Sequence, residues 1–187
     1  MPPFGEPSAR LLIVGLAPGL QGANRTGRPF TGDYAGDLLY GTLGEFGFAT
    51  GVYKARIDDG LRLKDAAIVN AVRCVPPQNK PLPVEMAHCR PYLAAALEEM
   101  PALRVVVALG RVAHESVVRA VGGRLSALPF AHGAEFAIDG PNGPATLIDS
   151  YHCSRYNTNT RVLTPDMFRA VFARARALVD AAPVKRR

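Results

Sequence analysis

Residues 11–17 read Leu-Leu-Ile-Val-Gly-Leu-Ala and form the first of four short apolar runs in the chain. The other three runs span residues 66–72, 105–109 and 145–149. Each has about the length of a strand and is continuously apolar, without the alternation of a strand that has one face in water. Continuous runs are typical of strands buried on both faces of a parallel sheet. The sequence therefore predicts four buried parallel strands.

Segments with helical spacing of apolar residues lie between and after these runs. We expect helices after Gly110 and over residues 36–46, 83–99 and 165–179. Pro83 suits the first turn of its helix, whereas Pro91 should kink or restart that helix. Strands that alternate with helices predict an α/β sandwich with right-handed crossover connections.

Length and composition narrow the class of protein. The chain has 187 residues, of which 48% are hydrophobic, and a formal net charge of +6. These values predict a single domain over residues 1–187 with a core of its own. No apolar run approaches the ~18–20 residues of a membrane span, and the first residues do not resemble a signal peptide, so we expect a cytoplasmic protein. The positive charge favours a polyanionic partner such as nucleic acid, and residues 185–187 are either a DNA-contacting tail or a solvated end.

The glycine-rich loop after the first run, Gly15 to Asp33, is a candidate ligand site. It matches neither the dinucleotide fingerprint nor the P-loop, which disfavours nucleotide binding. Phe30 is either a stacking platform or a buried anchor of the loop. Several side chains are of types that bind phosphates or bases, namely Asn24, Arg25, Thr26, Arg28 and Thr31.

Two further candidates follow other predicted strands, at the sheet edge where ligands bind in α/β folds. His152 comes directly after the fourth run, and either serves a structural role or acts in a site. Asn70 ends the second run, where its amide must find a partner, either the backbone or a bound base edge. The polar loop after His152 suits a nucleic-acid backbone through Ser154, Arg155, Tyr156, Asn157 and Asn159.

The three cysteines are Cys74, Cys89 and Cys153. A zinc site or an iron–sulfur cluster takes about four protein ligands. Spacing alone therefore favours buried thiols over a metal site.

Three long segments in order resemble the uracil-DNA glycosylase superfamily, and most closely its family-five, type-b branch. They are Gly15-Leu-Ala-Pro-Gly through Asn24-Arg-Thr-Gly-Arg-Pro-Phe-Thr-Gly-Asp33, then Ala71 to Pro81, then Ser150 to Thr160. The resemblance covers nearly the whole chain. It implies a three-layer α/β/α sandwich with a central four-stranded parallel sheet. It also implies base excision repair, by removal of uracil and, as candidate substrates, hypoxanthine and xanthine from DNA.

The resemblance also assigns roles to residues. Phe30 stacks on the flipped base, Asn70 reads its edge, and Leu16 and Gly19 complete the base-binding set. His152 donates a hydrogen bond to the uracil O2 as negative charge develops on the leaving base. Contacts to DNA are expected from Arg25, Arg28, Ser154, Arg155, Tyr156 and Asn157.

The water nucleophile needs separate reasoning, because many superfamily members carry a carboxylate or Asn where this chain has Ala17. The type-b branch shares this apolar residue. Asn24 is the favoured residue to position water, since it lies where related enzymes carry a carboxylate. Asp33 could instead stabilise the developing cation or cap the following helix.

The family usually carries a [4Fe–4S] cluster held by four cysteines. Cys74 and Cys89 match two of the four, and the other two belong to an N-terminal segment of the family that is apparently missing here. We therefore expect no cofactor in this chain. The leading hypothesis is a monomeric, monofunctional DNA glycosylase. The alternative is a catalytically silent nucleic-acid-binding domain of the same fold.

Overall fold

The four apolar runs form adjacent strands of one sheet in a computed structural model that describes residues 1–181. The strands lie in the order β5-β2-β6-β8 and are mutually parallel. Their bounds are Leu11–Gly15 for β2, Ala66–Asn70 for β5, Val105–Leu109 for β6 and Gly143–Ser150 for β8. The predicted four-stranded parallel centre of the sheet is confirmed.

Two antiparallel edge strands extend this centre to a mixed six-stranded sheet, which the sequence analysis did not foresee. The strand β1 (Phe4–Gly5) pairs with β5, and β7 (Glu135–Gly140) pairs with β8. The β7–β8 hairpin turns through Pro141 and Asn142 before Gly143, and Asn-Gly is a hairpin signal that could have revealed it. A separate small ladder joins β3 (Ala49–Thr50) and β4 (Arg62–Leu63).

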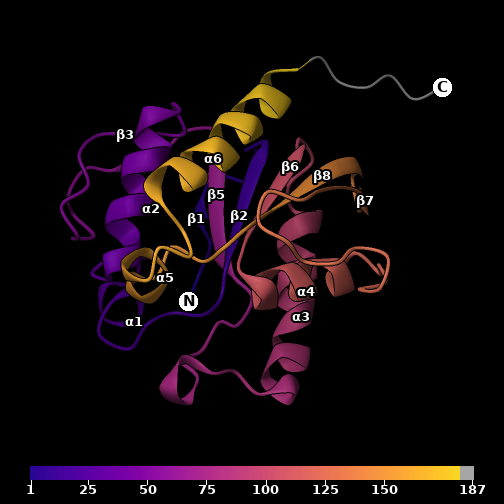
Figure 1. Ribbon diagram of the computed structural model, residues 1–187, viewed down its shortest axis with the longest axis horizontal. Helices are drawn as coiled ribbons and strands as arrows, with labels where there is room; N and C mark the ends of the chain where they lie inside the picture. Colours follow the sequence, from indigo (N-terminus) through magenta and orange to yellow (C-terminus); the bar gives the residue numbers. More distant parts are fainter. Residues whose placement is uncertain (182–187) are drawn as a thin grey trace.

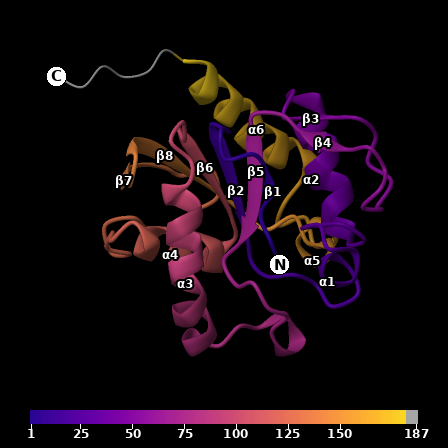
Figure 2. The ribbon, with the colours of Figure 1, turned by 180° about the vertical axis from the view of Figure 1, so that it is seen from behind.

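Helices cover both faces of the sheet, as the two opposite views show (Figures 1 and 2). The helices α2 (Tyr34–Glu45) and α6 (Pro165–Asp180) pack on the face that presents Leu11 and Ile13 of β2. The helices α3 (Pro83–Glu98) and α4 (Arg111–Ala120) pack on the face that presents Leu12 and Val14. Successive residues of one strand thus enter opposite cores, which explains why the apolar runs are continuous.

Of the two effects predicted for Pro91, a kink or a restart of the helix, the restart is wrong. Pro83 occupies the first turn as expected, and the helix then continues through Pro91 to Glu98. A proline in this position removes the hydrogen bond to the carbonyl of Ala87. Ala87 is exposed, so water can satisfy that carbonyl.

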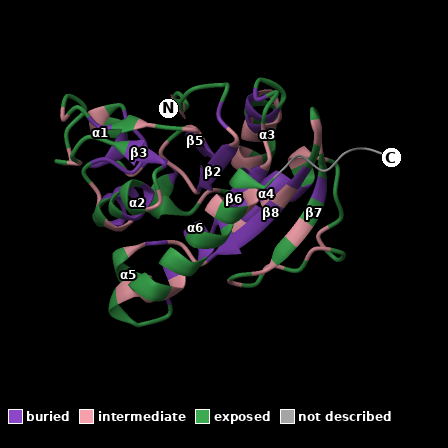
Figure 3. Cartoon of the chain, turned by 90° about the horizontal axis from the view of Figure 1, so that it is seen from above, coloured by how far each residue is buried: buried purple, intermediate pink, exposed green. Residues whose placement is uncertain are grey.

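The strands at the centre of the sheet are buried (Figure 3). Loops and short elements follow their carboxyl ends. These elements are α1 (Ala23–Thr26), a 3-10 turn at Pro77–Asn79 and α5 (Arg155–Asn159). They follow the carboxyl ends of β2, β5 and β8, where ligands bind in α/β folds. Within residues 1–181 no helix is long and apolar enough to cross a membrane. The basic residues 185–187 lie outside the described part of the chain.

Candidate functional site

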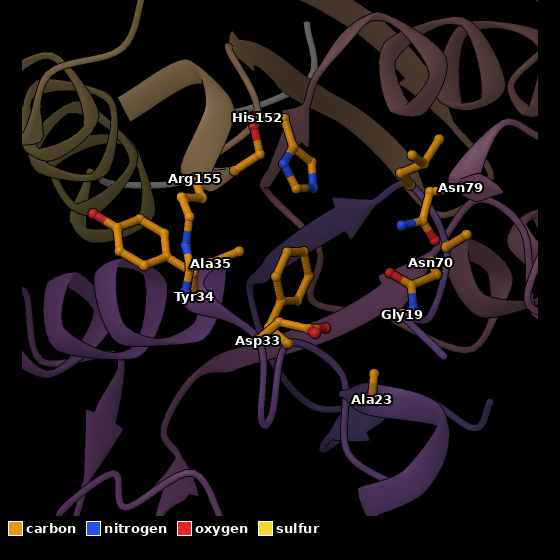
Figure 4. Close-up of a pocket in the computed structure, with 13 residues that line it drawn as sticks. Gly19, Ala23, Asp33, Tyr34, Ala35, Asn70, Asn79, His152 and Arg155 are labelled. Carbon is orange, nitrogen blue, oxygen red and sulfur yellow. The ribbon is translucent and has the colours of Figure 1, made fainter. Parts of the chain in front are cut away.

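A pocket of about 520 Å³ opens at the carboxyl ends of β2, β5 and β8 (Figure 4). Most residues that the sequence assigned to a site line its wall: Leu16, Ala17, Gly19, Phe30, Asp33, Asn70, His152, Ser154 and Arg155. The assigned residues that do not line it are Asn24, Arg25, Thr26, Arg28, Thr31, Tyr156, Asn157 and Asn159. Pockets of ~300–1,000 Å³ are the usual size of small-molecule sites, so a pyrimidine or a purine base fits by volume.

Phe30 forms one wall of the pocket and is held in an unusual backbone conformation. Its φ of 55° lies in the left-handed region, which costs an L-residue about 1–2 kcal/mol. The Tyr53 hydroxyl donates a 3.1 Å hydrogen bond to the Phe30 carbonyl. Phe30 is 7% exposed and packs in the α2–α6 core. Phe30 is therefore both the loop anchor and the aromatic wall of the pocket.

His152 lies beside Phe30, and the two rings are 5.9 Å apart at their centroids with planes inclined by 28°. The Asn157 amide donates a 2.8 Å hydrogen bond to the His152 carbonyl, which fixes the turn that carries the imidazole. Burial lowers the pKa of His152 to about 4, so the ring is neutral near pH 7. Among the described residues no side chain or backbone group hydrogen-bonds to the ring nitrogens, which leaves an N–H to be offered to a ligand.

Asn70 ends β5 and directs its side chain towards the same pocket (Figure 4). The residue is 7% exposed, and within the described chain its Oδ1 atom has no hydrogen-bond partner. A buried unpaired oxygen costs ~1–3 kcal/mol, so its presence at a pocket indicates a ligand donor. Gly15 allows this arrangement, because a Cβ there would lie 2.5 Å from Oδ1 of Asn70 and 2.6 Å from the Phe30 ring.

Asp33 lines the pocket, whereas Asn24 is exposed on α1 and does not line it. Asp33 occupies the N-cap position of α2, but its side chain makes no capping hydrogen bond. The carboxylate instead lies against Gly22, where an added Cβ would come within 2.1 Å of it. Burial raises the pKa of Asp33 above its ordinary value. Asp33 is thus the only carboxylate among the residues that line the pocket.

The structure places Arg28 away from the exposed surface that its predicted phosphate contact would require, and that contact stays untested. Arg28 is 3% exposed, and its guanidinium donates two hydrogen bonds of 2.8 and 2.7 Å to the fully buried carboxylate of Asp59. A side chain that is buried and paired in this way does not reach a DNA backbone. Arg25 is exposed and donates to the Gln21 carbonyl, so it remains available at the surface.

The loop after His152 forms the short helix α5 at the pocket mouth. The Ser154 hydroxyl caps the helix by accepting a hydrogen bond from the backbone N–H of Asn157. Both residues therefore shape the loop itself. Arg155 is exposed, and its guanidinium lies over the Tyr34 ring, 5.2 Å from the centroid. Tyr156 is 74% exposed. A DNA contact by these residues stays a prediction.

Four lining residues were not singled out from the sequence: Ala23, Tyr34, Ala35 and Asn79. Asn79 and its neighbour Gln78 both have positive φ, at 55° and 52°. The Pro76-Pro77-Gln-Asn79 segment signals an irregular loop but carries no sign that its last amide faces the pocket. Tyr34 follows Asp33 directly and begins α2.

The three cysteines lie in different environments. Cys74 is exposed, Cys89 is partly buried and accepts a 3.5 Å hydrogen bond from the Arg73 amide, and Cys153 is buried. Burial raises the pKa of the Cys153 thiol to about 12, which keeps it protonated. Across residues 1–181 no three His, Cys, Asp or Glu side chains come together as metal ligands. The residues present therefore do not fit a cluster that takes four thiolates.

The amino-acid sequence of this chain is similar to those of known proteins. Residues 2–176 match the family described as the uracil DNA glycosylase superfamily. The type-5 uracil-DNA glycosylase of Thermus thermophilus is 47% identical over 178 residues, which are 95% of this chain and 80% of that protein. The type-5 enzyme of Pyrobaculum aerophilum is 38% identical over 177 residues, which are 95% of this chain and 75% of that protein. The type-4 enzyme of Sulfurisphaera tokodaii is 29% identical over 175 residues, with 91% and 72% covered.

The family match extends over the three segments that build the pocket as well as over the sheet that supports it. The chain therefore belongs to the uracil-DNA glycosylase superfamily.

Proposed function

We propose that this chain is a monofunctional uracil-DNA glycosylase of base excision repair. The observation that carries the proposal is the meeting of three groups in one pocket. These groups are the Phe30 ring, the unpartnered Oδ1 atom of Asn70 and the neutral imidazole of His152. Enzymes that act on a base take it out of the duplex and hold it by stacking and by hydrogen bonds to its edge. The pocket supplies a surface for the first and polar groups for the second.

The reaction is the hydrolysis of the N-glycosidic bond. The bond between the base nitrogen and C1′ breaks, the electron pair stays on the base, and a water oxygen bonds to C1′. The proton released from water neutralises the departing base. A neutral His152 N–H directed at the uracil O2 stabilises the negative charge on the base, and one preorganised donor is worth roughly 10²–10³ in rate.

Asp33 is the residue best placed to hold the water or to stabilise the positive charge that develops on the sugar. It lines the pocket, whereas Asn24, which the sequence favoured, is exposed outside it. We therefore propose Asp33 rather than Asn24 for this role, with Ala17 as an apolar part of the wall. A positioned acid–base group contributes about 10²–10⁴ in rate.

Substrate range and partner follow from the same pocket. A volume of about 520 Å³ accommodates purines as well as pyrimidines, which supports hypoxanthine and xanthine as further substrates. Damaged DNA is the proposed macromolecular partner, with Arg25, Arg155 and Tyr156 as surface contacts. We also propose that the chain acts as a monomer, which stays a prediction.

Single-turnover excision tests the proposal. The chain is incubated with an end-labelled duplex that contains one U·G pair, and hot alkali then cleaves any abasic site. We expect strand scission by the wild type, a loss of roughly 10²-fold or more in His152→Ala, and no loss in His88→Ala, whose side chain is exposed on α3. A folded wild-type chain that binds the duplex but produces no scission would establish the silent binding domain instead.

A further inference from the structure

The loop that carries Phe30 rests on a buried ion pair that the reaction does not use directly. Arg28 donates from Nη1 and Nη2 to the two carboxylate oxygens of Asp59, at 2.8 and 2.7 Å. Its Nε donates a 2.7 Å hydrogen bond to the Thr31 hydroxyl. Arg28 thus binds Thr31 in its own loop and Asp59 in a second loop, 31 positions further along the chain.

Three aromatic rings enclose the guanidinium of this pair. Phe4, Tyr40 and Tyr53 lie 5.5, 5.4 and 5.6 Å from it. Two of these rings hold the backbone that follows Arg28. The Tyr40 hydroxyl donates to the Pro29 carbonyl, and the Tyr53 hydroxyl donates to the Phe30 carbonyl at 3.1 Å.

This arrangement explains how Phe30 keeps its left-handed backbone. A residue at a φ of 55° persists only where its surroundings fix it, and such residues concentrate at functional sites. Gly36 of α2 lies so close that an added Cβ would come within 1.9 Å of the Phe30 carbonyl oxygen. The carbonyl is therefore confined between α2 and the Tyr53 hydroxyl. The Arg28 guanidinium lies over the ring of this tyrosine and favours its position.

Asp59 is itself well anchored. Its carboxylate accepts hydrogen bonds from the backbone amides of Lys54 at 2.9 Å and Leu61 at 3.0 Å. The loop of residues 51–61 is thereby tied to the loop of residues 28–31. Tyr53 belongs to the second loop, and its hydroxyl bonds to the Phe30 carbonyl, so the joined loops act on the residue that forms the pocket wall.

We propose that Arg28 and Asp59 are positioning residues of the base pocket, which hold the Phe30 ring in the orientation for stacking without touching DNA. This proposal rests on the function proposed above. It assigns Arg28 a role different from the phosphate contact that its residue type suggests. Loss of the pair should slow excision while duplex binding is retained.

The chain contains a matched control for this pair. Arg56 and Asp58 lie in the same loop as Asp59 and also make a two-point ion pair, from Nε and Nη2 of Arg56 at 2.9 and 2.7 Å. Their side chains are 71% and 63% exposed, against 3% and 0% for Arg28 and Asp59. Arg56→Lys and Asp58→Asn therefore make the same chemical changes without touching the pocket.

The first experiment separates chemistry from binding. We would compare Arg28→Lys and Asp59→Asn with the two control variants. Single-turnover excision gives the rate, and the Kd is measured on a duplex with a tetrahydrofuran abasic-site analogue, which has no base to stack. We expect at least a tenfold loss of rate with a Kd within twofold of wild type, and no change in the controls. A raised Kd with an unchanged rate would instead show a direct phosphate contact and overturn the proposal.

The second experiment does not depend on activity. The chain is labelled with 4-fluorophenylalanine, and the ¹⁹F resonance of Phe30 is identified by its absence in Phe30→Leu. We expect this resonance to shift or broaden in Arg28→Lys and Asp59→Asn, but not in the controls. An unchanged resonance would refute positioning even if the wild type excises uracil. If the wild type excises nothing, the proposed function fails while this measurement still decides the proposal on positioning.

Tyr53→Phe covers the case in which the ion-pair variants do not fold, as judged by circular dichroism. It removes only the hydroxyl that donates to the Phe30 carbonyl. We expect the same change in the Phe30 resonance and a smaller loss of rate. A wild-type resonance and rate in this variant would contradict the proposal.

Discussion

The ring of His152 lies against the ring of Phe30, with centroids 5.9 Å apart and planes inclined by 28°. A base inserted between two rings would need about 6.8 Å, twice the ~3.4 Å spacing of stacked bases. The base therefore does not enter between them. It can stack on Phe30 while the imidazole contacts its edge, which is the geometry that a hydrogen bond to a carbonyl oxygen requires.

Phe30→Leu tests the stacking surface. Stacking of one base on an aromatic side chain is worth ~1–3 kcal/mol, so we expect excision to slow by about tenfold or more. Because Phe30 also packs in the core, the variant should lose on the order of 1 kcal/mol of stability. Phe48→Leu is the matched control, since Phe48 is fully buried in the same core cluster but does not line the pocket. Equal losses of rate in the two variants would show that stability, not stacking, limits excision.

The pKa of His152 predicts a pH profile. At about 4 in the folded chain, this pKa lies below the ordinary value of 6.5. The imidazole is thus neutral throughout the range from pH 5.5 to 8, and we expect the single-turnover rate to show no inflection near 6.5. A step near 6.5 that disappears in His152→Gln would mean that the imidazole titrates normally.

The same pKa links folding to pH. Between pH 6.5 and 4 the unfolded chain binds a proton at His152 that the folded chain does not, so stability falls as the pH falls through this window. Denaturant titrations of wild type and His152→Gln should diverge there, with the wild type losing more stability. Since burial also lowers the pKa of His132, the difference between the two proteins is the informative quantity.

Asp33→Asn and Asn24→Ala form a second matched pair. If Asp33 holds the water or stabilises the sugar cation, its variant should slow excision by about 10²-fold. Asn24→Ala should change the rate by less than threefold, because the side chain is exposed outside the pocket. The stability of Asp33→Asn should stay the same or rise, since burial disfavours the ionised carboxylate. The opposite order of rates would return the role to Asn24.

Local sequence patterns predicted the strands that are buried on both faces of the sheet. They did not predict its two edge strands. The four central strands were visible because both of their faces are buried, which leaves an unbroken apolar run. The strand β1 has only two residues and no periodicity to detect. The residues of β7 are mostly exposed or partly exposed, so they form no apolar run. Only the Asn142-Gly143 turn signalled this strand.

Residues chosen because they follow a predicted strand line the pocket more often than residues chosen for their side-chain type. Asn70 and His152 were assigned correctly to one edge because parallel strands end together there. Arg28 was assigned by its side-chain type, and Asn24 by its position relative to a carboxylate of related enzymes; neither signal shows exposure. The partner of Arg28 is Asp59, 31 residues away in an irregular loop, and no local pattern pairs them. Asn24 lies on α1, a single turn whose exposed side faces away from the pocket wall.

Cys74 and Cys89, which match two of the family's four cluster ligands, lead to a prediction about the cofactor content of the protein. With two thiolates available, we expect anaerobically purified protein to show no absorbance band near 400 nm, and Cys74→Ser with Cys89→Ser to leave the excision rate within twofold. Cys153→Ser is the contrasting variant, because it places a hydroxyl in a fully buried position and should lower the Tm. Iron bound in stoichiometric amount would refute the prediction.

Asn70→Leu should keep or raise the stability of the protein while it lowers the rate of excision. Leucine has nearly the shape of asparagine but no polar atoms, and it removes a buried oxygen that has no partner within the described chain. Such an oxygen costs ~1–3 kcal/mol in the free protein, and 1 kcal/mol corresponds to about 2–4 °C of Tm at this chain length. We therefore expect a Tm that is equal to or above that of wild type. Excision of uracil should fall by about tenfold or more, because the amide that meets the base edge is gone. Asn142→Leu is the control, since its amide donates to the carbonyls of Leu97 and Glu98 and the variant should lower the Tm without slowing excision. A lower Tm in Asn70→Leu would show that the amide oxygen is satisfied in the free protein, and that the pocket is not poised for a base at this position.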